Sequence, residues 1–442
     1  MSIQILLPRW IIPIIPRHTV YSDYALVMNG ERIIALQAKD EALAAYPQAT
    51  ITELPEHALL PGLVNLHAHS AMTLLRGFAD DLPLMRWLNE HIWPAEGMHV
   101  SDEFVFDGSQ LAIAEMIAGG TTSCNDMYFH HSAVARAALD AGFRMTIGCS
   151  ILEFPTAFAS NADDYIGKAL KSRDEFLGET LVNFTLAPHA PYTVSDTTFG
   201  RIITLADQLN LSIHCHIHET TDEIAGSLKE YGVRPLERLA QLGLLDSPLI
   251  AAHMVHTTDT EIALLTQKGV HIAHNPASNL KLASGFARIH DQLGAGINVG
   301  IGTDGAASNN KLDMFAEMRL AALLAKGQSG NPEAIPAWQA LEMATLNGAI
   351  ALGQLGQIGS LEVGKQADLI AVNLAACGTQ PCYDPVSHLV YAADRNQVSD
   401  VWIAGRAVYR QQQHQTLKLG EIESKTRYWQ HKIKAGISSK AL

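Results

Sequence analysis

Residues 63–69 read Leu-Val-Asn-Leu-His-Ala-His, a short apolar run that closes on two histidines. A continuous apolar run of about four to eight residues is typical of a strand that is buried on both faces, as in parallel sheets. Seven more such runs follow, each separated from the next by a segment long enough for a crossover helix. The eight predicted strands are residues 63–66, 121–126, 144–152, 181–186, 211–217, 249–252, 270–273 and 297–301.

The segments between these strands carry helix boundary signals. One helix is predicted to start at Ser101, with Asp102 and Glu103 in its first turn, and to end at Gly119 and Gly120. Others are predicted from Asp196 and over residues 312–325. Eight βα units within residues 61–356 favour a (β/α)8 TIM-type barrel of the α/β class. An open doubly wound sheet would need a glycine-rich phosphate loop after the first strand, and the sequence has none there.

The two ends of the chain resemble each other in their strand patterns. Residues 24–28 and 32–36 flank Asn29-Gly30, a strong signal for a hairpin turn. Residues 367–373 and 398–404 are also predicted strands, with Gly405 at a turn. We therefore predict a small β-sandwich domain from residues 1–60 and 357–415, a catalytic barrel over 61–356, and a helical tail over 416–442.

The composition narrows the class of protein. Hydrophobic residues make up 48% of the 442 residues and charged residues 17%, which excludes wholesale disorder. The net charge of −14 disfavours nucleic acids and membrane surfaces as partners. The five cysteines show no C-x-x-C spacing, and the apolar N-terminus lacks the features of a secretory signal. We expect a cytoplasmic protein without a disulfide framework.

Polar residues stand where the predicted strands end. In a TIM-type barrel the carboxyl ends of the strands meet at one mouth, so these side chains should face one another. Residues two apart on a strand point the same way, which lets both histidines of the first strand reach one ion. The same rule leaves open which of three histidines of the fifth strand is a ligand. The strand-end residues are His67, His69, His189, His214, His216, His218, His253, His274 and Asp304.

Imidazoles and a carboxylate at several strand ends predict a metal site. Such a set suits a borderline divalent ion such as zinc, with one position left for water. No Lys or Glu at the end of the fourth strand is placed to bridge a second ion, so we expect one ion per chain. A single histidine is more often structural than a ligand, and we interpret His274, before Asn-Pro, as a residue that satisfies a turn.

These strand ends resemble the amidohydrolase superfamily, in its branch with one metal ion, and the resemblance covers nearly the whole chain. Within that branch, five runs are similar to the 5-methylthioadenosine/S-adenosylhomocysteine deaminases, which are related to chloro-triazine hydrolases and guanine deaminases. The runs are HAHSAMTLLRGFADDLPLMRWL (67–88), HIWPAE (91–96), LAPHAPYTVS (186–195), AHNPASNLKLASG (273–285) and GTDGAASNNKLDMFAEMRLA (302–321).

The resemblance implies a role for individual residues. It selects His216 on the fifth strand and makes Glu219, three residues later, a catalytic residue together with His253 and Asp304. The implied metal ligands are His67, His69, His216 and Asp304. The implied substrate contacts are Glu96, with its carboxylate toward the ribose hydroxyls, His189, Glu219, Asp304, Trp87 and Ser308. Arg144 begins its strand and is therefore not expected at the mouth of the barrel.

The activity implied is zinc-dependent hydrolytic deamination of adenine nucleosides: 5-methylthioadenosine, and also S-adenosylhomocysteine or adenosine, to the inosine analogue and ammonia. Asp304 would accept the proton of the attacking water, Glu219 would protonate a ring nitrogen, and His253 would hold the attacking oxygen. One alternative is a deaminase or chlorohydrolase of another heteroaromatic compound, such as guanine, a pterin or a triazine. The other is a non-catalytic barrel scaffold. The expected partners are a small purine nucleoside and further copies of the chain, in a homo-oligomer.

Overall fold

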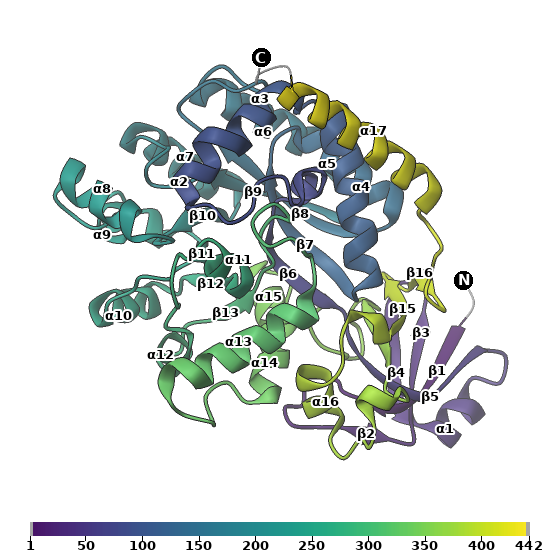
Figure 1. The fold of residues 1–442 in the computed structure, drawn as a ribbon. Helices are drawn as coiled ribbons and strands as arrows, with labels where there is room; N and C mark the ends of the chain where they lie inside the picture. The colour runs from purple at the N-terminus through teal and green to yellow at the C-terminus, as the bar shows by residue number, and fades with distance from the viewer. Residues whose placement is uncertain (1–2, 439–442) are drawn as a thin grey trace.

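The computed structural model describes residues 3–438, and an eight-stranded parallel sheet forms its centre (Figure 1). The strands neighbour one another in chain order, as expected when each is followed by a crossover. They are β6 (Leu63–Ala68), β7 (Thr121–Tyr128), β8 (Arg144–Ile151), β9 (Val182–Pro188), β10 (Ile213–Ile217), β11 (Leu249–His253), β12 (His271–His274) and β13 (Val299–Ile301).

The last strand returns to the first and closes the sheet. The Asp304 N–H donates to the His67 carbonyl at 2.9 Å. One residue earlier, the Thr303 N–H donates to Asn65 Oδ1 at 3.0 Å. Glycine is needed beside this seam, because a Cβ at Gly302 would lie 2.8 Å from the His67 nitrogen. The predicted (β/α)8 barrel of the α/β class is confirmed.

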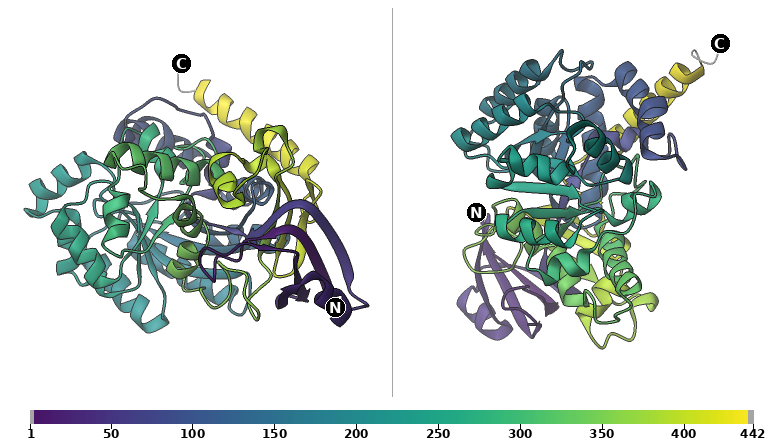
Figure 2. Two further views of the ribbon diagram at one scale, coloured as in Figure 1. Left: turned by 90° about the horizontal axis from the view of Figure 1, so that it is seen from below. Right: turned by 90° about the vertical axis from the view of Figure 1, so that its left-hand side faces the viewer.

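Helices surround the barrel strands (Figures 1 and 2). The Ser101 side chain accepts a hydrogen bond from the N–H of Phe104 and so caps α4 (Asp102–Ala118), as predicted. The helix predicted from residue 312 begins later, because Asp313 caps α13 (Met314–Ser329). The others are α5 (His131–Ala141), α6 (Ala162–Glu175), α7 (Asp196–Leu209), α8 (Thr221–Tyr231), α9 (Pro235–Gln241), the 3-10 turn η3 (Leu244–Asp246), α10 (Asp259–Lys268), α11 (Pro276–Lys281), α12 (Ile289–Gly294), α14 (Ala337–Met343) and α15 (Leu346–Ala351). None of the helices in residues 3–438 has the length and apolarity required to traverse a bilayer.

The long connection between β6 and α4 is a chain of short helical turns. Pro94 lies in the first turn of the last of them, where a missing N–H has no cost. This connection contributes several residues to the cavity described below. Its elements are η1 (Ser70–Leu75), α2 (Leu84–Trp87), the π-helical turn η2 (Leu88–Ile92) and α3 (Trp93–His99).

Strands from the two ends of the chain form a second, mixed sheet. Its order is β17-β16-β15-β14-β5-β1-β3-β4, and β2 pairs with β1. Leu26 and Met28 share one buried cluster with Leu369 and Trp402, so strands from the two chain ends pack against each other. The strands are β1 (Ile3–Ile11), β2 (Tyr21–Ser22), β3 (Tyr24–Asn29), β4 (Arg32–Ala38), β5 (Thr50–Pro61), β14 (Leu369–Asn373), β15 (Val398–Ile403), β16 (Arg406–Arg410) and β17 (Gln413–His414). The short helices beside this sheet are α1 (Lys39–Ala45), η4 (Cys377–Thr379), α16 (Pro385–Tyr391) and η5 (Arg395–Gln397). The domain boundaries at residues 60, 356 and 415 stay predictions.

The C-terminal helix α17 (Leu419–Ser438) runs along α4 and is docked on it (Figure 1). Trp429 is fully buried, and its indole N–H donates to Asp107 Oδ2 at 2.9 Å. Lys425 binds the other oxygen of Asp107 at 2.6 Å. Together with Trp429, the buried side chains of Ile422 and Ile433 form an apolar stripe on α17. The mostly polar composition of the segment did not indicate this stripe.

Candidate active site

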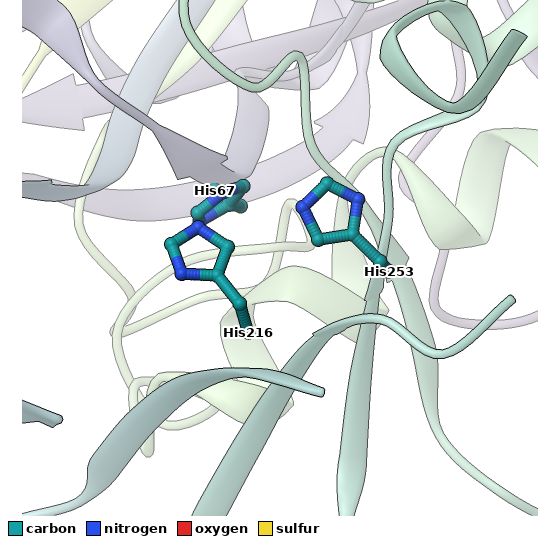
Figure 3. A group of neighbouring side chains, drawn as sticks. All are labelled: His67, His216 and His253. Carbon is teal, nitrogen blue, oxygen red and sulfur yellow. The ribbon is translucent and has the colours of Figure 1, made fainter. Parts of the chain in front are cut away.

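Four side chains from the first, fifth and eighth barrel strands converge at the mouth of the barrel. Asp304 Oδ1 lies 3.3 Å from His67 Nε2 and 3.2 Å from His69 Nε2. His69 Nε2 lies 3.3 Å from His216 Nε2. His253, from the sixth strand, completes a second close group with His67 and His216, and Figure 3 shows these three rings directed toward one another.

The donor atoms of this cluster fit a divalent ion. The Nδ1 atom of His69 bonds to the Met127 carbonyl at 2.6 Å, and that of His216 bonds to the His189 carbonyl at 2.7 Å. A carbonyl only accepts, so each ring carries a proton on Nδ1 and directs Nε2, the nitrogen that would bind a metal, into the cluster. His67 Nε2 is buried without a hydrogen-bond partner, as expected for an atom whose partner is an ion.

The three histidines of β10 lie in different surroundings. His216 faces the cluster, whereas His214 lies behind His67, with its Nε2 at 3.0 Å from His67 Nδ1. His218 turns away, and its Nε2 accepts the N–H of Leu236 at 3.1 Å. The three histidines therefore occupy three distinct environments, and His216 is the one whose Nε2 lies beside the Nε2 atom of His69 within the cluster.

The charges of the cluster point to a cation at its centre. Burial lowers the pKa of His67 to about 4. Burial also acts against the charged form of His69, but its bond to Asp304 outweighs this and raises its pKa to about 9. Burial opposes the charge of Asp304 too, yet the adjacent rings of His67 and His69 hold its pKa well below the ordinary value. A bound metal ion would displace the shared proton and take over the pairing with this carboxylate.

At two strand ends, the backbone adopts a left-handed conformation that directs the side chain into the cluster. Asp304 has φ of 61° and His253 has φ of 75°, a left-handed conformation that costs a non-glycine residue about 1–3 kcal/mol. Hydrogen bonds hold Asp304 in this position: its Oδ2 accepts from Ser278 Oγ at 2.6 Å and from Ser308 Oγ at 2.9 Å, and its Oδ1 accepts from the Gly305 N–H at 2.8 Å.

Glu219 and His253 face each other beside the cluster. Glu219 Oε2 lies 3.9 Å from His253 Nε2, and the opposite nitrogen of His253 bonds to Asn279 Oδ1 at 2.8 Å. Glu219 is almost fully buried, and this burial raises the pKa of its carboxyl above the ordinary value. The carboxylate of Glu223 accepts the N–H groups of His218 at 2.9 Å and Glu219 at 2.8 Å, which fixes the turn that carries Glu219.

A cavity of about 240 Å³ opens above the cluster. Glu96, from α3, lies in its wall, and Glu96 Oε1 accepts a hydrogen bond from the Tyr128 hydroxyl at 2.6 Å. Burial raises the pKa of the Glu96 carboxyl to about 7. All six predicted substrate contacts line this one cavity, although they come from distant parts of the chain: Trp87, Glu96, His189, Glu219, Asp304 and Ser308.

The structure also identifies supporting residues that the sequence analysis did not single out. Tyr128, Glu223 and Asn279 each bond directly to a residue of the site or to its backbone. Tyr128 ends its strand and Asn279 lies in one of the quoted runs, so both offered a signal. Glu223 offered none, because an acidic residue in the first turn of a helix is common.

Two other residues that the sequence brought into consideration lie outside the cluster. His274 is buried at the end of β12, and its Nδ1 has no hydrogen-bond partner. Arg144 begins β8, at the opposite end of the barrel from the mouth, and forms a paired contact with Asp368 at 2.8 and 3.0 Å.

Comparisons with known proteins agree with this geometry. A model of the amidohydrolase family matches residues 58–408. A protein of Teredinibacter turnerae named 5-methylthioadenosine/S-adenosylhomocysteine deaminase is 46% identical over 426 residues, which cover 96% of each chain. The crystal structure of an adenosine deaminase from Xanthomonas campestris with bound zinc matches with a TM-score of 0.96 and 46% identity over 98% of both chains. A zinc complex of atrazine chlorohydrolase from Arthrobacter aurescens matches with a TM-score of 0.90 and 23% identity, over 96% of this chain and 99% of that one, and shares the fold.

Proposed function

The chain belongs to the amidohydrolase family, and on this premise we propose that it is a zinc-dependent hydrolytic deaminase of adenine nucleosides, with 5-methylthioadenosine as its first candidate substrate. One observation carries the proposal. A buried acid, Glu219, lines the same cavity as the histidine–aspartate cluster and the carboxylate of Glu96. Hydrolytic deamination of a nucleoside requires three features: an acid that protonates the ring, a site for the metal ion, and a residue that binds the ribose.

We assign the ion to His67, His69, His216 and Asp304. Three imidazoles and one carboxylate suit zinc, and the zinc-containing relative from Xanthomonas campestris supports this identity. When bound, such an ion acts as a Lewis acid and lowers the pKa of a water molecule toward about 7. One ion per chain remains our expectation, because the mouth of β9 offers His189 and no bridging carboxylate.

The residues of the chain move the protons. Asp304 accepts a proton from the attacking water, while the raised pKa of Glu219 favours the protonated form that donates to a ring nitrogen. His253, beside Glu219, hydrogen-bonds the attacking oxygen. As the bond from C6 to the amino nitrogen breaks, the proton of the hydroxyl now on C6 passes through Glu219 to that nitrogen, and ammonia leaves. The proton held by Asp304 then returns Glu219 to its acidic form. The product carries a carbonyl in place of the amino group.

The position of Glu96 favours a nucleoside over a free base. Its Oε1 is engaged by Tyr128, and its second oxygen is available to accept from the hydroxyls of a ribose. A guanine, pterin or triazine has no vicinal diol for this carboxylate to bind. A scaffold would have no use for the acid, the ion ligands and this contact together.

Ammonia release from a panel of compounds tests the proposal. With zinc-loaded protein we expect turnover of 5-methylthioadenosine and adenosine, and little with guanine, a pterin, a triazine or cytosine. Preference for one of the free heterocycles would instead support the alternative substrate class. No ammonia from any compound would support the scaffold.

Glu96→Ala should lower kcat/KM for 5-methylthioadenosine by roughly 10- to 100-fold, because each charge-assisted hydrogen bond to a hydroxyl contributes about 1.5–3 kcal/mol. On 2′- or 3′-deoxy analogues the loss should be smaller. Steady-state kinetics on matched ribo and deoxy substrates measures both effects.

Glu90→Ala serves as the control, since Glu90 is an exposed residue of the same segment that pairs with Arg86. We expect it to leave kcat/KM within twofold of the wild type. Equal efficiency of Glu96→Ala and the wild type on the ribonucleoside would remove the main residue-level reason for preferring a nucleoside.

A further inference from the structure

One wall of the cavity is apolar and aromatic. The Trp93 ring lies 5.8 Å from that of Phe154, and the Phe129 ring lies 6.0 Å from that of Phe158. The first contact joins α3 to the loop after β8, and the second joins the residue that follows β7 to the same loop. Phe154 is 37% exposed, which places it at the opening. Leu84, Leu88 and Leu152 complete this wall.

The same wall holds no cation. Among the described residues that line the cavity, none is a lysine or an arginine, and the acidic ones are Glu96, Glu219 and Asp304. Cations near the lining residues are paired with carboxylates at 2.6–3.1 Å, and one of them, Lys168, has its Nζ 5.0 Å from the centre of the Phe158 ring. The pairs are Arg86–Glu90, Lys168–Asp164, Arg238–Asp196 and Lys281–Asp80.

A bound nucleoside would span the cavity between these two regions. The ion cluster and Glu219 fix the end that holds the reacting carbon of the ring, and Glu96 takes the ribose. The 5′ substituent of the nucleoside would then pack against the aromatic wall. A thioether packs well against aromatic rings, whereas a carboxylate buried there without a partner is strongly disfavoured.

We propose that this cavity selects nucleosides with an uncharged, apolar 5′ substituent and discriminates against the amino-acid arm of S-adenosylhomocysteine. The inference rests on the proposed function, because it presupposes an adenine nucleoside in the cavity. It separates the two compounds joined in the names of the relatives, which differ only in what the 5′ sulfur carries: a methyl group or a four-carbon, zwitterionic amino-acid arm.

The test compares kcat/KM for three substrates: 5-methylthioadenosine, 5′-butylthioadenosine and S-adenosylhomocysteine. The butyl group repeats the four-carbon skeleton of homocysteine without its carboxylate and ammonium groups. We expect the butyl compound to fall within about fivefold of the methyl compound, and S-adenosylhomocysteine to lie at least about 100-fold below the butyl compound, as an unpaired buried charge requires.

Two results would overturn the inference and leave the proposed function standing. One is S-adenosylhomocysteine within about threefold of the butyl compound. The other is an equal loss for both long substituents, since length rather than charge would then decide. Absence of ammonia from all three would overturn the proposed function as well.

A cation added to the wall should reverse the selection. Phe154→Arg, at the opening, is expected to raise the ratio of kcat/KM for S-adenosylhomocysteine to that for the butyl compound by at least about tenfold. Ala157→Arg, an exposed position in the same wall, provides a second variant should the first be destabilised. Phe154→Leu is the matched control and should leave the ratio unchanged. An unchanged ratio in a folded arginine variant would contradict the inference.

Discussion

Glu219→Gln is expected to retain its metal while kcat falls by about 100- to 10,000-fold, the usual contribution of a general acid–base group. Glutamine keeps the size of the side chain but supplies no acidic proton for the ring nitrogen. Glu219 faces His253 at 3.9 Å and is not among the four assigned ligands, so the ion should stay. Metal analysis and steady-state kinetics on 5-methylthioadenosine, made on the same preparation, measure the two properties.

Glu230→Gln is the matched control for this variant. Glu230 is exposed on α8, the helix that follows Glu219, and its replacement should leave kcat within twofold of the wild type. A loss below tenfold for Glu219→Gln would count against a role in proton transfer. Loss of the metal along with turnover would reassign Glu219 as a ligand.

His67→Ala is expected to abolish tight metal binding and to lower activity by at least about 1,000-fold, because several kcal/mol of charge stabilisation in the transition state depend on the ion. His67 is fully buried, and its Nε2 has no other partner. The melting temperature of the wild type should rise when zinc is added to the metal-free protein, since a ligand that binds the folded state stabilises it. The melting temperature of the variant should not respond to zinc.

His431→Ala controls for the loss of a histidine in general. His431 is exposed on α17, and its replacement should leave both the zinc response and the activity of the wild type. A His67→Ala protein that still melts at a higher temperature with zinc would show that His67 is not a ligand.

The strands of the barrel could be predicted from the sequence because they are buried on both faces. A continuous apolar run such as residues 249–252 is typical of a buried parallel strand, and the end of each run lies at the mouth of the barrel. The convergence of His67, His69 and Asp304 follows from that geometry, since parallel strands end on one side.

Other features depend on contacts that no local pattern contains. The left-handed backbone of Asp304 appears only once distant segments meet, because its side chain accepts from Ser278 and its N–H donates to the His67 carbonyl. The docking of α17 could not be predicted from the composition of its segment, because only a few apolar side chains, such as Trp429, make the buried contact. The apolar wall of the cavity combines segments about sixty residues apart, as Trp93 and Phe154 illustrate.

Titration of metal-free protein with zinc, followed by ammonia release from 5-methylthioadenosine, tests the central claim most directly. We expect no activity without metal, a linear rise with added zinc, and a plateau at one equivalent per chain. Activity that needs two equivalents, activity that persists without metal, or no ammonia at any zinc level would contradict the assignment of a zinc-dependent deaminase with one ion per chain.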